Sequence, residues 1–151
     1  MLISLVVILI IGILTAAALP QYQKAVAKSR FTQLQTAGKT LKNAMELYYM
    51  ANGDYPNYWS ELDMEYPGCP DGGGHYMLWC DKFAVDMFDG ANTNLVLWDT
   101  HGLPNHGKTM SSLQLREQAL SQYIIWLDNS EYPGKMECRS KITGLCQTLG
   151  Y

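Results

Sequence analysis

Charge is scarce in this chain and is missing from its first 23 residues. Charged side chains make up 17% of the 151 residues, the net charge is −3, and the first charged residue is Lys24. This composition excludes a large basic surface of the kind that binds nucleic acid. No basic residue precedes the N-terminal apolar run, and the run is longer than the apolar core of a signal peptide. The sequence therefore argues against a cleaved secretory signal.

The cysteines lack the spacing of a zinc site. Cys69, Cys80, Cys138 and Cys146 form no C-x-x-C motif, which is the usual ligand spacing of structural zinc. Four cysteines suit an oxidising compartment and allow three disulfide pairings.

Other signals of site chemistry are also sparse. The three histidines stand beside glycine or turn residues, which favours the surface over a ligand role; they are His75, His101 and His106. Asp86 with Asp89, or Asp128 with Glu131, could bind calcium, but no ligand spacing specifies such a site. No nucleophile–base constellation stands out. We therefore expect no catalytic residue, metal or cofactor.

What the chain does have is an apolar run, Met1–Leu19, reading MLISLVVILIIGILTAAAL. As a helix rising about 1.5 Å per residue, it matches the roughly 30 Å hydrocarbon core of a bilayer. Gly12 and Pro20 both weaken a helix, and Pro20 leaves the carbonyl of Ala16 without its amide partner. Thr15 or a neighbouring chain is available to satisfy that carbonyl.

An amphipathic helix continues from the apolar run without a loop. One apolar stripe recurs at spacings of three or four, formed by Ala27, Phe31, Leu34, Ala37, Leu41, Met45 and Tyr48. Asn52-Gly53 is a helix-ending signal. We predict one helix over residues 1–51, of which 1–19 span a membrane.

The remaining residues, 52–151, predict a small globular β domain. A loop over 54–74, with a helical turn at 60–64, precedes one or two strands within 75–88. Further strands are predicted at 94–99 and 122–128, and 111–121 is ambiguous between helix and strand. Successive strands with short turns indicate an antiparallel sheet, packed on the apolar stripe of the helix. The predicted fold class is α+β.

The run LVVILIIGILTAAALPQYQKAVAKSRFTQLQTAGKTLKNAMELYYMANGDYP resembles the N-terminal helix of type IV pilins and of the related type II secretion pseudopilins. The resemblance covers about a third of the chain. It implies a structural subunit, not an enzyme, that waits in the inner membrane with its domain exported. The subunit then joins other pilin subunits and their assembly machinery in a cell-surface pilus or periplasmic pseudopilus. The helix positions implied in assembly are Leu5, Val6, Ile8, Leu9, Gly12, Leu14, Pro20 and Tyr22.

The chain also departs from the family pattern. Pilins carry a basic leader ending in glycine, a phenylalanine after the cleavage point, and a glutamate inside the apolar run. Alignment on Gly12 and Pro20 puts Ile3 at the glutamate position, or Ser4 if one residue is deleted, and no acidic residue precedes Glu46. Either the start of the gene is misassigned, or the chain is a variant with different assembly. A membrane-anchored binding module that never polymerises is the alternative.

The resemblance also favours one disulfide pairing. Cys138 and Cys146 bracket a C-terminal loop like the disulfide-bound loop of many pilins, which leaves Cys69 to pair with Cys80.

One motif points to a different function. Residues 102–109, GLPNHGKT, fit the phosphate-binding pattern G-x-x-x-x-G-K-[ST]. A phosphate-binding loop of this kind needs a parallel sheet with a full helix between its strands. The chain between Thr109 and Tyr123 barely allows such a helix. We therefore interpret the segment as a turn between strands, with nucleotide binding as the less favoured hypothesis.

Overall fold

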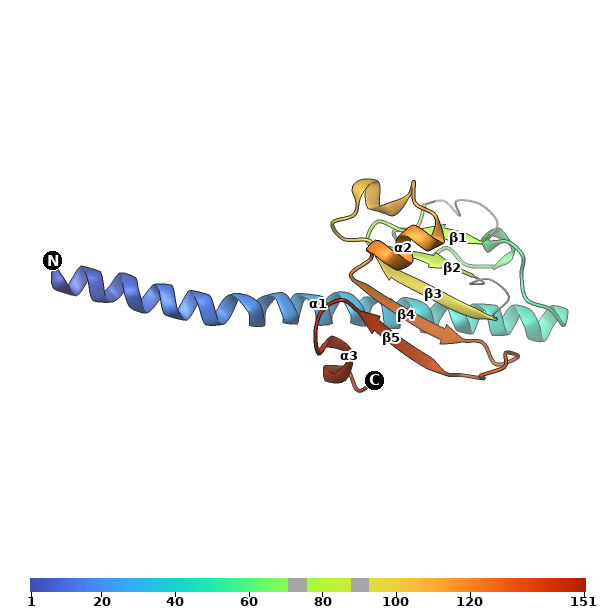
Figure 1. Cartoon of the computed structure of the whole chain (residues 1–151). Coiled ribbons are helices and arrows are strands. Elements are labelled where there is room, and N and C mark those ends of the chain that lie inside the picture. Colours follow the sequence, from blue (N-terminus) through green and yellow to red (C-terminus); the bar gives the residue numbers. More distant parts are fainter. Residues whose placement is uncertain (71–75, 88–92) are drawn as a thin grey trace.

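One long helix carries a small sheet along one side. The computed structural model describes residues 1–70, 76–87 and 93–151. Helix α1 (Leu2–Asn52) extends its N-terminal half away from the rest of the chain, and its C-terminal half supports the sheet (Figure 1). This is the α+β arrangement predicted from the sequence.

Helix α1 ends where the sequence predicts. Gly53 adopts φ 77°, and its amide donates to the carbonyl of Tyr49 at 2.7 Å, which closes the last turn. Pro20 lies inside the helix. Thr15 is not the partner of the Ala16 carbonyl, because its hydroxyl donates to the carbonyl of Ile11 at 2.7 Å. A helical threonine reaches back toward the residue four positions earlier, so that part of the prediction is wrong.

The sheet is an antiparallel meander of five strands in chain order. The strands are β1 (Met77–Trp79), β2 (Phe83–Asp86), β3 (Asn94–Asp99), β4 (Ser121–Trp126) and β5 (Met136–Ser140). The prediction for β3 is confirmed at both ends, and β4 begins one residue and ends two residues before the predicted strand. Strand β5 was not predicted, because its sequence MECRS lacks an apolar alternation.

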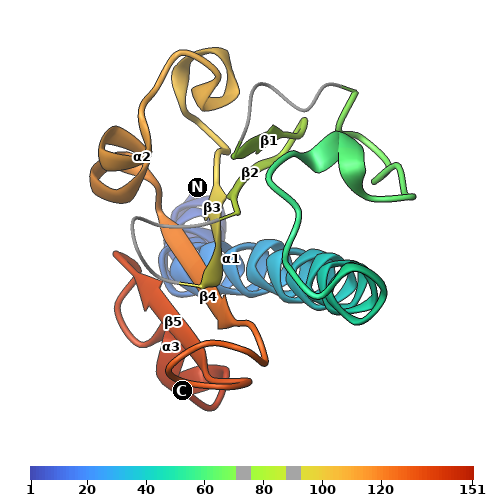
Figure 2. The ribbon, with the colours of Figure 1, turned by 90° about the vertical axis from the view of Figure 1, so that its right-hand side faces the viewer.

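The connections contain short helical segments. These are η1 (Trp59–Glu61), η2 (Pro104–Gly107), α2 (Ser112–Gln118) and α3 (Leu145–Thr148). The ambiguous segment 111–121 forms a helix because Ser111 and Gln114 make a reciprocal capping box. Figure 2 shows α1 and α2 on opposite sides of the sheet, where α2 covers a second, smaller core around Trp98.

The main core lies between α1 and the inner face of the sheet. The predicted apolar stripe is buried, except that Tyr48 is half-buried, and its residues from Phe31 to Met45 belong to this core. It packs against alternate residues of the central strands, which include Leu95, Leu97, Tyr123 and Ile125. Alternation along β3 and β4 therefore sets which residues meet the helix.

Gly38 marks the closest approach of the helix to the sheet. A Cβ placed on it would lie 2.9 Å from Cε1 of Tyr123 and 3.2 Å from Cδ1 of Leu97. Both neighbours are fully buried and cannot swing into solvent. Glycine is therefore required here for packing, although it is a poor residue for a helix interior.

We expect Gly38→Ala to destabilise the domain by about 1–3 kcal/mol through overpacking, despite the better helix propensity of alanine. The free energy of unfolding of the full chain in detergent, followed by tryptophan fluorescence, measures the effect. Gly12→Ala is the matched control, because the space around Gly12 is open. Equal stability of the two variants would contradict the close approach.

Candidate functional site

The apolar half of α1 makes no contact that buries it. All eight predicted assembly positions are exposed, from Leu5 to Tyr22. Ile8 and Leu9, for example, are 67% and 64% exposed, and the first buried residue of the helix is Ala27. The chain thus presents an extended apolar surface that a soluble monomer rarely carries.

This half-helix is long and apolar enough to cross a membrane, and it is uncharged as far as Lys24. A charge-free apolar segment of that length is typical of a membrane span. The two disulfides are typical of a domain in an oxidising compartment.

Each of the two disulfides ties one edge of the sheet to a neighbouring segment of the chain. Cys69 is bonded to Cys80, so the loop after η1 is tied to the end of β1, and Cys138 is bonded to Cys146, which ties β5 to α3. This is the pairing that the resemblance implies. Each closes a short loop and restricts the unfolded chain, a contribution of roughly 2–3 kcal/mol in the chain-entropy model.

A polar clamp holds the far end of α1 to two loops. The Glu46 carboxylate accepts hydrogen bonds from the Tyr55 hydroxyl at 3.0 and 3.1 Å and from the Asp128 amide at 2.8 Å. The Tyr55 hydroxyl accepts from the Asn129 amide at 3.2 Å, and Lys42 pairs with the Asp128 carboxylate at 2.5 Å. Burial, the Glu46 hydrogen bond and the two nearby carboxylates outweigh the Asn129 amide and raise the pKa of Tyr55 to about 12.

The G-x-x-x-x-G-K-T segment lies between β3 and α2. The strands on either side of it, β3 and β4, are antiparallel, and α2 spans only seven residues. The amides of His106 and Lys108 already donate to the carbonyls of Leu103 and Asn105, at 3.2 and 3.1 Å. A phosphate-binding loop instead points free amides at its ligand.

Sequence reasoning missed a close acid–imidazole pair at the end of β3. Asp99 Oδ1 lies 2.5 Å from His101 Nδ1 and also accepts the His101 amide at 3.0 Å. The spacing D-x-H directly after a strand could have revealed it. Within the described ranges, no serine, threonine or cysteine side chain hydrogen-bonds to the His101 ring. The pair therefore lacks the nucleophile of a catalytic triad in this part of the chain.

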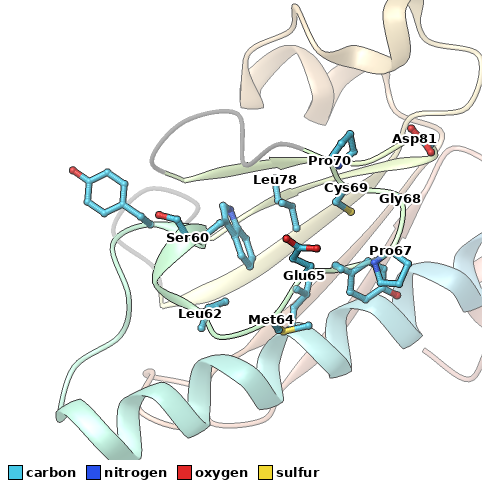
Figure 3. Close-up of a pocket in the computed structure, with 14 residues that line it drawn as sticks. Ser60, Leu62, Met64, Glu65, Pro67, Gly68, Cys69, Pro70, Leu78 and Asp81 are labelled. Carbon is cyan, nitrogen blue, oxygen red and sulfur yellow. The ribbon is translucent and has the colours of Figure 1, made fainter.

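A cleft of about 830 Å³ opens between α1, β1 and the 58–70 loop (Figure 3). Its floor is formed by core residues, including Leu41, Trp59 and Leu78. The volume suits a small ligand, but binding sites also need polar groups that converge on one point. Here Ser60 and Asp81 lie toward opposite ends of the cleft, and the carboxylates of Glu65 and Asp81 belong to exposed residues (Figure 3).

Metal-binding groups do not gather in the described part of the chain. Among those residues, no three His, Cys, Asp or Glu side chains come together as ligands. Asp128 is engaged by Lys42 in the polar clamp. His75 and Asp89 lie outside the described residues.

Comparison of the chain with protein-family models, with curated proteins and with solved structures gave no match.

The polar clamp predicts a pH-dependent contribution from Tyr55. We expect Tyr55→Phe to lose about 1–2 kcal/mol of stability at pH 8, because the Asn129 amide and Glu46 lose a buried partner. The folded-state pKa of Tyr55 lies above the ordinary tyrosine value of 10, so this stability is present below pH 10 and disappears as the pH rises toward 12. The free energies of unfolding of the wild type and of Tyr55→Phe, measured at pH 8 and pH 11, show whether the two stabilities converge. The exposed Tyr132→Phe is the control, and a difference between wild type and Tyr55→Phe that is as large at pH 11 as at pH 8 would contradict the clamp.

The turn interpretation of GLPNHGKT predicts that Lys108→Ala changes stability by no more than about 0.5 kcal/mol, as for other solvated surface residues. Isothermal titration with Mg-ATP should detect no binding to the wild type or to the variant. Micromolar binding that is lost in Lys108→Ala would establish a nucleotide site instead.

Proposed function

We propose that this protein is a structural subunit of a type IV pilus or a related pseudopilus. The observation that carries the proposal is the division of α1. Its first half is apolar on every side and exposed, and its second half buries one stripe beneath the sheet. An apolar surface of this extent needs a second environment to cover it, either lipid or other subunits.

The mechanism follows from the uniform apolarity of residues 1–19. Lipid tails and the side chains of neighbouring helices are alike in polarity, so the helix can exchange one for the other without exposing itself to water. The subunit is held in the inner membrane before assembly. On assembly, the half-helix joins those of other subunits in the filament core, and the domain of residues 52–151 forms the filament surface.

Gly12 and Pro20 support packing between chains. Both lower helix stability, and nothing lies within 4 Å of the position a Gly12 Cβ would occupy. The monomer therefore gives no packing reason for this glycine. A helix of another subunit packed closely against Gly12 would supply that reason. A bend or stretch at Pro20 would let the helix keep such neighbours.

The alternative is a membrane-anchored module that does not polymerise. It is favoured by one observation, the lack of any acidic side chain in the apolar run. In pilins, the glutamate of that run is thought to pair with the terminal amine of the next subunit. The exposed apolar half-helix suits both the pilus subunit and the anchored module. The two proposals differ in whether the helices of different chains contact one another.

The proposal predicts that Leu9→Cys chains cross-link through α1. In cells that contain the pilus assembly machinery, a bismaleimide should join the single free thiols of neighbouring helices and give covalent dimers, while the native cysteines remain bonded to one another. The same variant in cells without the machinery is the control. If Leu9→Cys remains monomeric in both strains, the anchored module is the better description.

A further inference from the structure

An open groove of about 270 Å³ lies between α1 and α3, just past the apolar half of α1. The residues that line it are Gln21, Lys24, Ala25, Lys28, Leu145 and Thr148. Leu145 is fully buried and anchors α3 beside the helix, and the Cys138–Cys146 disulfide ties α3 to β5. The groove is therefore held by fixed elements on both sides.

Two lysines on the same face of α1 give this groove its charge. Lys24 and Lys28 are one helical turn apart and exposed, a spacing that places both ammonium groups on one side of the helix. Within residues 1–70, 76–87 and 93–151, no carboxylate lies within ion-pair distance of either lysine. The residue that precedes α3 comes close to one of them, since a Cβ on Gly144 would lie 3.4 Å from Lys24 Nζ.

The position of the groove along α1 matches the headgroup layer of a bilayer. If residues 1–20 fill the hydrocarbon core, Lys24 lies about 6 Å beyond it, within a headgroup layer roughly 5–8 Å thick on each side. Tyr22 is 68% exposed between the two levels, which is where amphipathic aromatic residues are enriched. The domain and the bilayer surface therefore meet at the groove.

We propose that the groove between α1 and α3 binds the phosphate group of an anionic phospholipid. Lys24 and Lys28 neutralise the phosphate, and the Gln21 amide lies beside them as a further donor. The acyl chains run along the exposed apolar surface of α1 toward Leu14. This site needs only the membrane-anchored subunit and does not depend on polymerisation.

A lipid fits this site better than free phosphate does. Ala25 and Leu145 give the groove apolar walls, and α1 continues from it as uninterrupted apolar surface toward the N-terminus. An acyl chain gains contact with that surface, whereas inorganic phosphate meets only two solvated lysines. Lysines near an anionic surface each raise affinity by about fivefold.

Native mass spectrometry of the full chain in detergent tests this site, with phosphatidylglycerol and phosphatidylcholine as probes. The wild type should retain phosphatidylglycerol in preference to phosphatidylcholine. Lys24→Gln with Lys28→Gln should weaken phosphatidylglycerol binding by roughly tenfold to thirtyfold. Lys39→Gln with Lys108→Gln removes the same charge away from the groove and should retain the preference.

A second pair of variants separates the groove from charge alone. Ala25→Phe fills the groove without changing charge and should also reduce phosphatidylglycerol retention, whereas the exposed Ser29→Phe should not. Equal losses in the groove and control variants would overturn the proposal in favour of general surface attraction. Displacement of the lipid by excess inorganic phosphate would overturn the phospholipid as occupant and leave a simple anion site.

Discussion

The contact between the apolar stripe of α1 and the inner face of the sheet is the constraint on which the rest of the structure depends. The inner face of the sheet is apolar and has to be buried against a second layer. The stripe from Phe31 to Met45 supplies the second layer. Gly38 lets the two layers approach closely enough for Tyr123 to lie against the helix backbone.

The two halves of this helix differ in the surface that they present. Its first half is apolar and exposed on every side, whereas its second half has one buried side. The change occurs between Lys24 and Ala27, where charge and burial both begin. Because α1 is continuous across this point, the position of the domain relative to a membrane is set by the helix rather than by a linker.

Periodicity made the second half of α1 predictable, because many residues repeat the same signal, and a short apolar run made β3 predictable. It could not reveal β5, whose exposed edge position needs no apolar alternation, or α3, which is a single turn held by a disulfide. The clamp around Glu46 was hidden for another reason. Its partners lie 9 and 82 positions away in the chain, and only the folded structure brings them together. The cleft beside Trp59 and the groove beside Lys24 are likewise products of tertiary packing.

The continuity of α1 has a mechanical consequence. With 51 residues, the helix is a rod of about 77 Å at 1.5 Å per residue. A pull on its N-terminal half acts along the rod and reaches the sheet as shear, so the buried residues from Ala27 to Met45 resist together. The clamp at Glu46 and the loop residue Tyr55 sits at the far end of this contact, where the helix would otherwise begin to slide. Tension is thereby shared across the whole helix–sheet contact and is not concentrated on a single hydrogen bond.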